Sequence, residues 1–120
     1  MKNSMWILLL VVVVGMTSVF KNSVAQASQS ELTQAISQGA MLVDVRTPAE
    51  FVAGSVKAAI NIPLDQLQQQ IAKFKGQKSI IVFCRSGSRS SQAKAILEKN
   101  GITHILNGGS WMNVQHIMGK

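Results

Sequence analysis

The chain has 120 residues and a formal net charge of +7, from 12 basic and five acidic residues. This length allows one small domain. The charge does not indicate a nucleic-acid-binding protein, because the lysines are scattered and aromatic residues make up only 5% of the chain. We interpret the positive charge as a source of solubility and of attraction for small anions.

The first 27 residues have the layout of a secretory signal peptide. Lys2 precedes a continuous apolar run over residues 6–14, and residues 25–27 (AQA) form a small-x-small cleavage pattern. We therefore expect residues 1–27 to be a signal peptide and the mature domain to lie in the periplasm.

A membrane anchor is the alternative interpretation of this segment. The apolar stretch of residues 5–20 is short for a membrane span of about 20 residues. Lys21 nevertheless lies between this stretch and the cleavage pattern, which is irregular for a signal peptide. If the segment is not cleaved, it holds the domain of residues 28–120 at the membrane, outside the cytoplasm.

The rest of the chain alternates between helix and strand patterns. Residues 28–31 (SQSE) fit the capping box of a helix that ends near Ser37. Residues 40–45 form an apolar run typical of a buried strand. Thr47 and Pro48 are suited to the cap and the first position of the next helix.

The same alternation continues to the end of the chain. Residues 58–62 predict a short strand, and the apolar spacing over residues 64–74 predicts an amphipathic helix. Residues 79–83 predict a central strand, residues 90–100 a helix and residues 103–106 a last strand. Because the strands are apolar runs, we expect a parallel α/β sheet with helices on both faces.

In such sheets, ligands bind beyond the carboxyl ends of the strands, where Asp44 and Cys84 are expected to lie. Cys84 is the only cysteine. In an oxidising compartment, a single thiol indicates a reactive group or an intermolecular bond. A buried, inert cysteine is the alternative. The residues that follow it favour an activated nucleophile, because a small-residue loop at a helix start presents N–H groups and arginines to an anion or thiolate: Arg85, Ser86, Gly87, Ser88, Arg89 and Ser90.

Three segments, in this order, are similar to motifs of one protein family. Residues 44–51 (DVRTPAEF) resemble D-x-R-x-x-x-E-[FY], and residues 54–63 (GSVKAAINIP) resemble G-H-I-x-G-A-x-N-[IL]-P. Residues 84–90 (CRSGSRS) match the loop C-x-x-G-x-R-S. Together they resemble the rhodanese family of sulfurtransferases, and in particular its small, exported, single-domain members of the phage-shock type.

The chain departs from the family pattern in a few places. Ser55 stands where histidine is common, and Ala58 stands where glycine is common. Residues 108–111 (GGSW) resemble a shortened form of the family's G-G-x-x-x-W ending. The family's first short strand corresponds to residues 26–28, next to the expected cleavage site. The resemblance thus implies a three-layer α/β domain with a central parallel sheet of four or five strands flanked by helices.

The resemblance also implies a reaction. Cys84 attacks the outer sulfur of thiosulfate or a similar anionic donor, sulfite leaves, and Cys84 carries a persulfide. A thiophilic acceptor, either cyanide or a thiol, then takes the sulfur. No cofactor is implied, and the protein is expected to be a monomer. The remaining loop residues are assigned to substrate binding: Arg85, Ser86, Gly87, Ser88, Arg89 and Ser90.

Outside the loop we expect structural roles. Asp44 is expected to accept local hydrogen bonds, and Arg46 is expected to pair with Glu50. We expect Trp111 and Met112 to pack in the core in preference to forming a pocket wall. No metal site is expected, because neither histidine has matching ligands near it in the sequence.

Two other functions share this type of loop. A non-enzymatic persulfide carrier or sulfur-relay module could contain the same residues. A cysteine phosphatase or arsenate reductase is the less favoured alternative, because such loops place five residues between cysteine and arginine. Only four residues separate Cys84 from Arg89.

Overall fold

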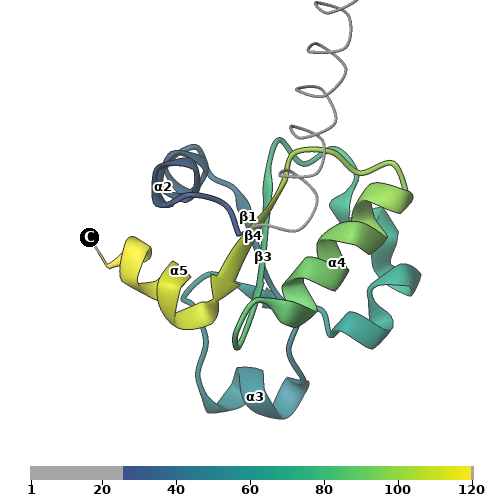
Figure 1. Ribbon diagram of the computed structural model, residues 1–120. Helices are drawn as coiled ribbons and strands as arrows, with labels where there is room; N and C mark the ends of the chain where they lie inside the picture. Colours follow the sequence, from purple (N-terminus) through teal and green to yellow (C-terminus); the bar gives the residue numbers. More distant parts are fainter. Residues whose placement is uncertain (1–25, 120) are drawn as a thin grey trace, which may run out of the picture.

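The computed structural model describes residues 26–119, which form a parallel sheet with helices on both sides (Figure 1). The predicted signal peptide therefore lies outside the described residues, apart from its last two. Among the helices of residues 26–119, none is long and apolar enough to cross a membrane. The elements in chain order are α2 (Gln29–Ser37), β1 (Met41–Asp44), α3 (Pro48–Ala53), β2 (Ile60–Asn61), the 3-10 helices η1 (Leu64–Gln66) and η2 (Gln68–Phe74), β3 (Ile80–Cys84), α4 (Ser88–Lys99), β4 (Ile105–Ser110) and α5 (Trp111–Met118).

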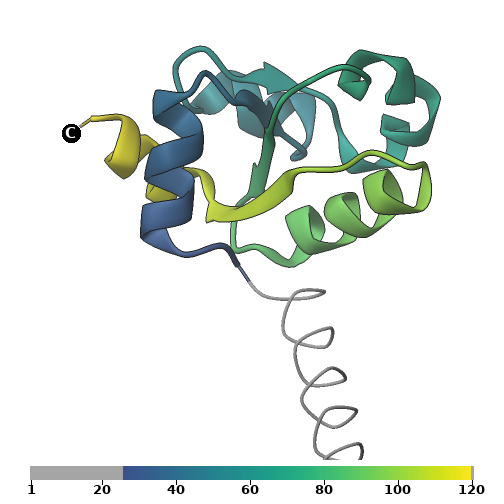
Figure 2. The ribbon, with the colours of Figure 1, turned by 90° about the horizontal axis from the view of Figure 1, so that it is seen from above.

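The sheet has four strands in the order β2-β1-β3-β4, and every neighbouring pair is parallel. Helices α2 and α5 cover one face, and α4 with the 3-10 segment covers the other (Figures 1 and 2). This arrangement confirms the predicted three-layer α/β fold, and its four strands are within the expected four or five.

Strand β3 shows why the strands are apolar runs. Ile80, Val82 and Cys84 belong to the buried cluster on the α4 face. Ile81 and Phe83 belong to the cluster on the face covered by α2 and α5. All five side chains are buried, because successive residues of a strand point to opposite faces and both faces are covered. The same alternation places the Cys84 thiol on the α4 side.

Two predicted helix starts are confirmed by their capping geometry. The Ser28 hydroxyl accepts a hydrogen bond from the Glu31 backbone N–H at 3.2 Å, and the Glu31 carboxylate accepts one from the Ser28 N–H at 3.2 Å. Thr47 and Glu50 repeat this capping box at the start of α3, where Pro48 occupies the first turn. Both caps satisfy N–H groups that would otherwise lack a partner at the helix start.

The prediction of one amphipathic α-helix over residues 64–74 was wrong in the type of helix. The segment consists of the two 3-10 helices η1 and η2, and Gln70 has non-helical backbone angles within η2. Leu67 and Phe74 are nevertheless fully buried against the α4 face. Burial of these two side chains fixes the path of the segment, and short 3-10 turns satisfy the same apolar spacing as an α-helix.

The boundaries near the site also differ from the expectation. Helix α4 begins at Ser88, two residues earlier than predicted, so the loop after Cys84 is shorter. Strand β4 runs through Gly108 to Ser110, beyond the predicted end. A Cβ at Gly108 would lie 2.9 Å from side-chain atoms of Ile81 and Val114, so only glycine lets α5 pack closely on this strand. The glycines therefore extend the strand and do not end it.

Candidate active site

The carboxyl ends of β1 and β3 lie side by side, because Asp44 pairs with Phe83 in the parallel register. Cys84 is the last residue of β3 and is only 1% exposed. The loop after it and helix α3 lie together at this end of the sheet, which is the lower end in Figure 1. The structure thus brings the predicted nucleophile to the position where ligands bind in open α/β sheets.

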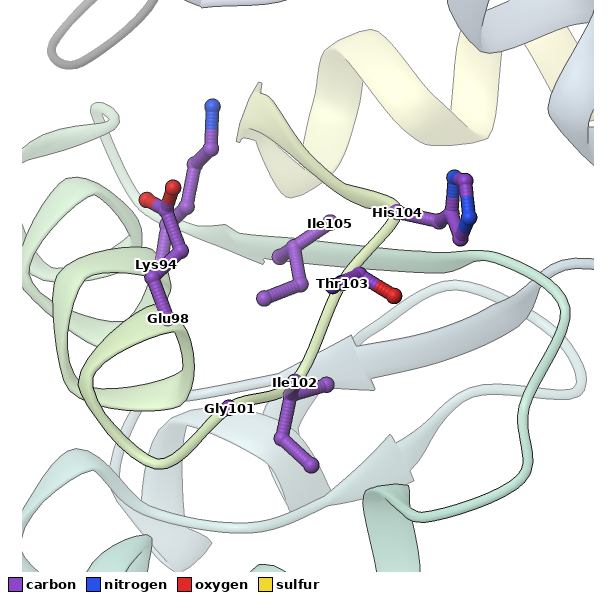
Figure 3. A pocket seen from close by; sticks show the side chains of 7 residues that line it. All are labelled: Lys94, Glu98, Gly101, Ile102, Thr103, His104 and Ile105. Atoms are coloured by element: carbon purple, nitrogen blue, oxygen red, sulfur yellow. The ribbon is translucent and has the colours of Figure 1, made fainter.

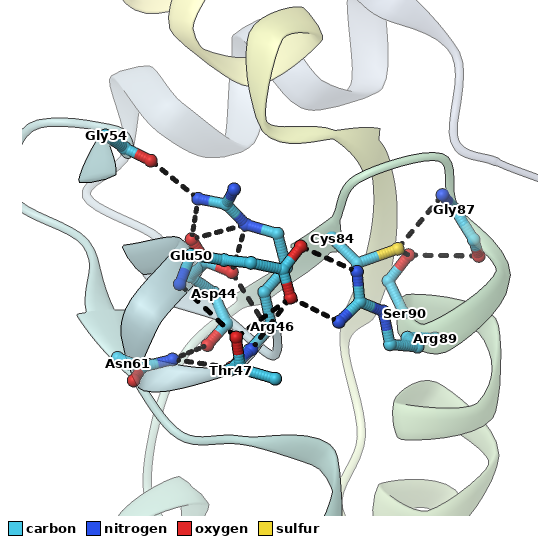
Figure 4. A network of polar contacts seen from close by, with 10 residues as sticks. All are labelled: Asp44, Arg46, Thr47, Glu50, Gly54, Asn61, Cys84, Gly87, Arg89 and Ser90. Carbon is cyan, nitrogen blue, oxygen red and sulfur yellow. Dashed lines mark hydrogen bonds and ion pairs between the residues drawn. The ribbon is translucent and has the colours of Figure 1, made fainter. Parts of the chain in front are cut away.

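Hydrogen bonds surround the Cys84 sulfur (Figure 4). The Gly87 backbone N–H donates to Sγ at 3.0 Å, and the Ser90 hydroxyl lies 3.5 Å from Sγ. Burial by itself raises the pKa of the Cys84 thiol. Hydrogen bonds from Ser90, Gly87 and Ser86 outweigh this effect, so the pKa lies below its ordinary value. The site favours the thiolate, which is the reactive form.

Gly87 makes this geometry possible. It is the N-cap of α4, with a φ of +104°, in a region that L side chains rarely adopt. The chain turns there so sharply that the Gly87 N–H points back at the sulfur three residues earlier. The first turn of α4 follows at once, and its positive end also faces the loop.

Asn107 supports the loop from the neighbouring strand β4, and sequence reasoning missed it. Its Oδ1 accepts hydrogen bonds from the Ser90 hydroxyl at 2.7 Å and from the Gly109 N–H at 3.0 Å. Asn107 is only 4% exposed. The signal that could have found it is a polar residue inside a strand whose neighbours are apolar or glycine. Asn107 holds Ser90 against the Cys84 sulfur.

The expected pairing of Arg46 with Glu50 was wrong. Arg46 instead pairs with Asp44, with 2.7 Å between Nη2 and Oδ2, and both residues are buried. Glu50 pairs with Arg89 through two hydrogen bonds of 2.7 and 3.1 Å. The two arginines have different partners because the Arg46 side chain turns back over the end of β1, whereas α3 places Glu50 near the start of α4 (Figure 4).

The Asp44 carboxylate is the centre of a buried network. It accepts hydrogen bonds from the Arg46 side chain and backbone, and from the Ser55 hydroxyl at 2.7 Å. Arg46 also donates to the Gly54 carbonyl at 2.7 Å, and its guanidinium carbon lies 5.2 Å from the centre of the Trp111 ring. Asp44 therefore accepts local hydrogen bonds as expected, and the network fixes the chain after α3.

The other loop side chains point outward. Arg85, Ser86 and Ser88 are exposed, and Arg85 lines a hollow of about 280 Å³ together with Trp111 and Met112. Met112 is 60% exposed, so its expected packing in the core was wrong. Trp111 both packs against the core and lines the hollow. The loop thus presents its charge at the surface and its N–H groups to the sulfur.

A larger hollow, of about 380 Å³, lies toward the other end of α4 from this loop (Figure 3). It is lined by the end of α4 and the chain that enters β4, including Lys94, Glu98 and His104. It contains neither Cys84 nor any residue of its loop, so size alone does not identify the reactive site. Within residues 26–119, no cluster of three or more His, Cys, Asp or Glu residues could hold a metal ion.

The profile of the family described as "Rhodanese-like domain" matches residues 28–112. The chain belongs to the rhodanese-like family. The thiosulfate sulfurtransferase PspE of Escherichia coli is 38% identical to it over 74 residues, which cover 60% of this chain and 71% of PspE. A sulfurtransferase of Allochromatium vinosum is 36% identical over 67 residues, which cover 56% of this chain and 63% of that protein.

Solved structures agree with this assignment. A rhodanese with anions from E. coli is 36% identical, with a TM-score of 0.58, and the match covers 62% of this chain and 91% of that one. A human single-domain sulfurtransferase, TSTD1, is 26% identical, with a TM-score of 0.63, and the match covers 79% and 96% of the two chains. The fold and the sulfurtransferase family are therefore established together.

The two departures from the rhodanese pattern now have a structural context. Ser55 keeps a polar contact, because its hydroxyl donates to the buried Asp44 carboxylate. Ala58 has a φ of +71°, in the left-handed region that favours glycine. The glycine that is common in the family at this position would adopt the same backbone without strain.

Proposed function

We propose that this protein is a thiosulfate sulfurtransferase that carries the transferred sulfur as a persulfide on Cys84. The observation that supports the proposal most directly is the contact between the Gly87 N–H and the Cys84 sulfur at 3.0 Å. A donor aimed at the sulfur stabilises a thiolate before substrate arrives. The name of the relative PspE supports thiosulfate as the donor.

The reaction has two displacements, and each returns the site to a defined state. In the first, the Cys84 thiolate attacks the outer sulfur of thiosulfate, a new S–S bond forms, and the S–S bond of thiosulfate breaks to release sulfite. In the second, cyanide or a thiolate attacks the outer sulfur of the persulfide. Thiocyanate or an organic persulfide leaves, and the Cys84 thiolate is regenerated.

The loop is suited to the charge changes in both steps. Thiosulfate brings two negative charges, and the backbone N–H groups at the start of α4 together with Arg85 provide a positive field. A solved E. coli rhodanese is described as a structure with anions, which supports an anionic substrate for this family member. In the persulfide the negative charge lies on the outer sulfur, and the N–H groups at the start of α4 are the donors that could stabilise it there.

The test compares wild type with Cys84→Ser in sulfite release from thiosulfate, with cyanide as acceptor, and in intact-protein mass after incubation with thiosulfate alone. We expect wild type to gain the mass of one sulfur atom and to turn over. The serine variant should lose at least about 99% of the rate, because loss of a nucleophile costs orders of magnitude. Substantial turnover by the variant would contradict the covalent scheme.

The same measurements separate an enzyme from a persulfide carrier. A carrier would gain the extra sulfur but would turn over only slowly with thiosulfate and a small acceptor. A cysteine phosphatase would instead release phosphate from a model aryl phosphate and would not be modified by thiosulfate. Steady thiocyanate formation supports the enzyme.

The proposal extends to location: residues 1–27 are a signal peptide, and the mature protein begins at Ser28 in the periplasm. Cleavage there would place the new ammonium group beside the Glu31 carboxylate, which already accepts from Ser28 N, and would remove Ala27, whose N–H donates to the Asn107 carbonyl at 2.9 Å. N-terminal sequencing of the protein from its own cells tests the proposal. An intact N-terminus in washed membranes would support the anchor instead.

A further inference from the structure

The hollow beside the active-site loop differs in character from the anion-binding loop itself. It has a volume of about 280 Å³, which suits a small organic molecule. Its wall is formed by the end of α3 and the start of α5, so it lies at the same end of the sheet as Cys84. The residues that line it are Arg46, Glu50, Ala53, Gly54, Arg85, Trp111 and Met112.

From this lining we infer that the hollow seats the sulfur acceptor, and that the acceptor is an organic thiol with an apolar body and a carboxylate. The inference rests on the proposed function and names the class of its second substrate. Arg85 links the hollow to the active-site loop, because it directly follows Cys84 in the chain and also lines the hollow.

The charges of the hollow leave one cation without a counter-ion. Arg46 is paired with Asp44, and the Glu50 carboxylate is paired with Arg89. Arg85 is exposed and forms no ion pair with any of residues 26–119. A carboxylate on the acceptor would give Arg85 a partner, and a planar guanidinium fork matches a carboxylate well. The positive charge of Arg85 would also offset the repulsion between the anionic thiolate of the acceptor and the anionic persulfide.

The apolar side of the hollow is exposed at the surface of the described domain. Met112 is 60% exposed at the start of α5, next to the partly exposed Trp111 ring. The Arg46 guanidinium lies against that ring, and its hydrogen bonds to Asp44 and Gly54 fix its position. A ring or alkyl body between these side chains would bury apolar surface that water now contacts.

The acceptor step balances with this occupant. The thiolate of the acceptor attacks the outer sulfur of the Cys84 persulfide and forms an organic persulfide. The S–S bond on Cys84 breaks, and the electron pair returns to the Cys84 sulfur as thiolate. No oxidant, reductant or further reactant is needed.

The test measures the acceptor step alone. Cys84 is loaded with sulfur by polysulfide, so that the result does not depend on thiosulfate, and loss of the extra sulfur is followed by rapid-quench mass spectrometry. The three probes are 4-mercaptophenylacetate, which has ring and carboxylate, 4-mercaptobenzyl alcohol, which has the ring only, and 3-mercaptopropionate, which has the carboxylate only. Rates are compared at equal thiolate concentration, and each is divided by the rate of the same thiolate with a small-molecule persulfide, because thiolate nucleophilicity rises with the pKa of the thiol.

We expect 4-mercaptophenylacetate to react about tenfold faster than either partial probe at low concentration, because each partial probe lacks one set of contacts. Equal thiolate-corrected rates for the three probes would overturn the inference. Thiocyanate formation from thiosulfate and cyanide is measured in parallel. Its absence would contradict the proposed function instead, so the two failures are distinguishable.

Charge changes at Met112 locate the effect in the hollow. Met112→Glu should lower the preference for the carboxylate probe over the alcohol about fivefold, and Met112→Lys should raise it, since exposed charges act with this strength. Val52, on α3, is 84% exposed and does not line the hollow. Val52→Glu and Val52→Lys are the matched controls, and they should leave the preference unchanged. Equal effects at both positions would overturn the placement.

Discussion

The carboxylate of Glu50 accepts two hydrogen bonds from the guanidinium of Arg89, with Nη1–Oε1 at 2.7 Å and Nη2–Oε2 at 3.1 Å. The same carboxylate caps α3 by accepting from the N–H and hydroxyl of Thr47. One side chain thus joins the first turn of α3 to the first turn of α4. Arg89, which lies in the motif that follows Cys84, is held in place and largely neutralised before any anion binds.

Arg89→Ala should therefore lower kcat/KM for thiosulfate by about tenfold, and Arg85→Ala should lower it by less. The reason is that removal of Arg89 also leaves the Glu50 carboxylate unpaired near an anionic substrate. The measurement is sulfite release at low thiosulfate concentration for both variants.

The double variant Glu50→Gln/Arg89→Ala is the control, because it removes both charges. It should recover part of the lost kcat/KM relative to Arg89→Ala alone. An equal or larger loss in the double variant would mean that Arg89 acts by direct contact with thiosulfate, without a contribution from the freed carboxylate.

The pair also predicts how stability depends on pH. The hydrogen bonds from Arg89 lower the pKa of Glu50 to about 2 from its ordinary value of 4.5. A lowered pKa in the folded state stabilises the protein above the ordinary value, and this stabilisation is lost as pH falls through about 2. Both side chains are about 30% exposed, so the contribution is about 1 kcal/mol or less.

We expect the free energy of unfolding of wild type to exceed that of Glu50→Gln by a constant amount above pH 5, with the difference shrinking between about pH 4.5 and 2. Denaturant titrations at a series of pH values measure it. Arg89→Gln supplies the control, since Glu50 then has no guanidinium partner. A difference that grows on acidification would contradict the assignment.

Ala58 offers a test of backbone strain away from the chemistry. Its φ of +71° costs an L residue about 1 kcal/mol, whereas glycine adopts it freely. Ala58→Gly should therefore raise the free energy of unfolding, by at most about 1 kcal/mol because glycine also makes the unfolded chain more flexible. Ala59→Gly, at the next position, is the control and should destabilise. Destabilisation by both changes would show that no strain is relieved.

The sequence was sufficient for the parts of the site that are local. A cysteine at the end of an apolar strand, a glycine and a helix start define the loop by themselves, and the capping boxes of α2 and α3 are also short-range features. Contacts between distant segments were not predictable. Glu50 and Arg89 are 39 positions apart, so the nearer Arg46 looked like the partner.

Two further differences have the same origin. Asn107 acts through β4, which continues past the predicted end at residue 106, through Asn107 and then through two glycines that resemble a strand end in the sequence. The segment over residues 64–74 has the apolar spacing of an α-helix, but it forms 3-10 turns because its apolar side chains must cover the α4 face of the sheet. In each case tertiary packing determines the outcome, and local propensity is a weak guide.

The last prediction concerns the hydrogen that Ser90 can donate. Ser90 has one hydroxyl hydrogen and three acceptors within reach: Asn107 Oδ1 at 2.7 Å, the Gly87 carbonyl at 3.1 Å and the Cys84 sulfur at 3.5 Å. When Cys84 becomes a thiolate, its charge makes it the strongest acceptor of the three. Ser90 then stabilises the thiolate, and Asn107 Oδ1 keeps its hydrogen bond from Gly109.

Wild-type Cys84 should therefore be alkylated by iodoacetamide with a midpoint below the ordinary pKa of a thiol, and Ser90→Ala should raise that midpoint because a donor to the thiolate is lost. Asn107→Asp should raise it as well, since a carboxylate competes more strongly for the Ser90 hydrogen and repels the thiolate. Asn107→Leu is the uncharged control and should cost about 1–3 kcal/mol of stability, because Ser90 and Gly109 lose a buried partner. If both Asn107 variants titrate like wild type, Asn107 has a structural role alone.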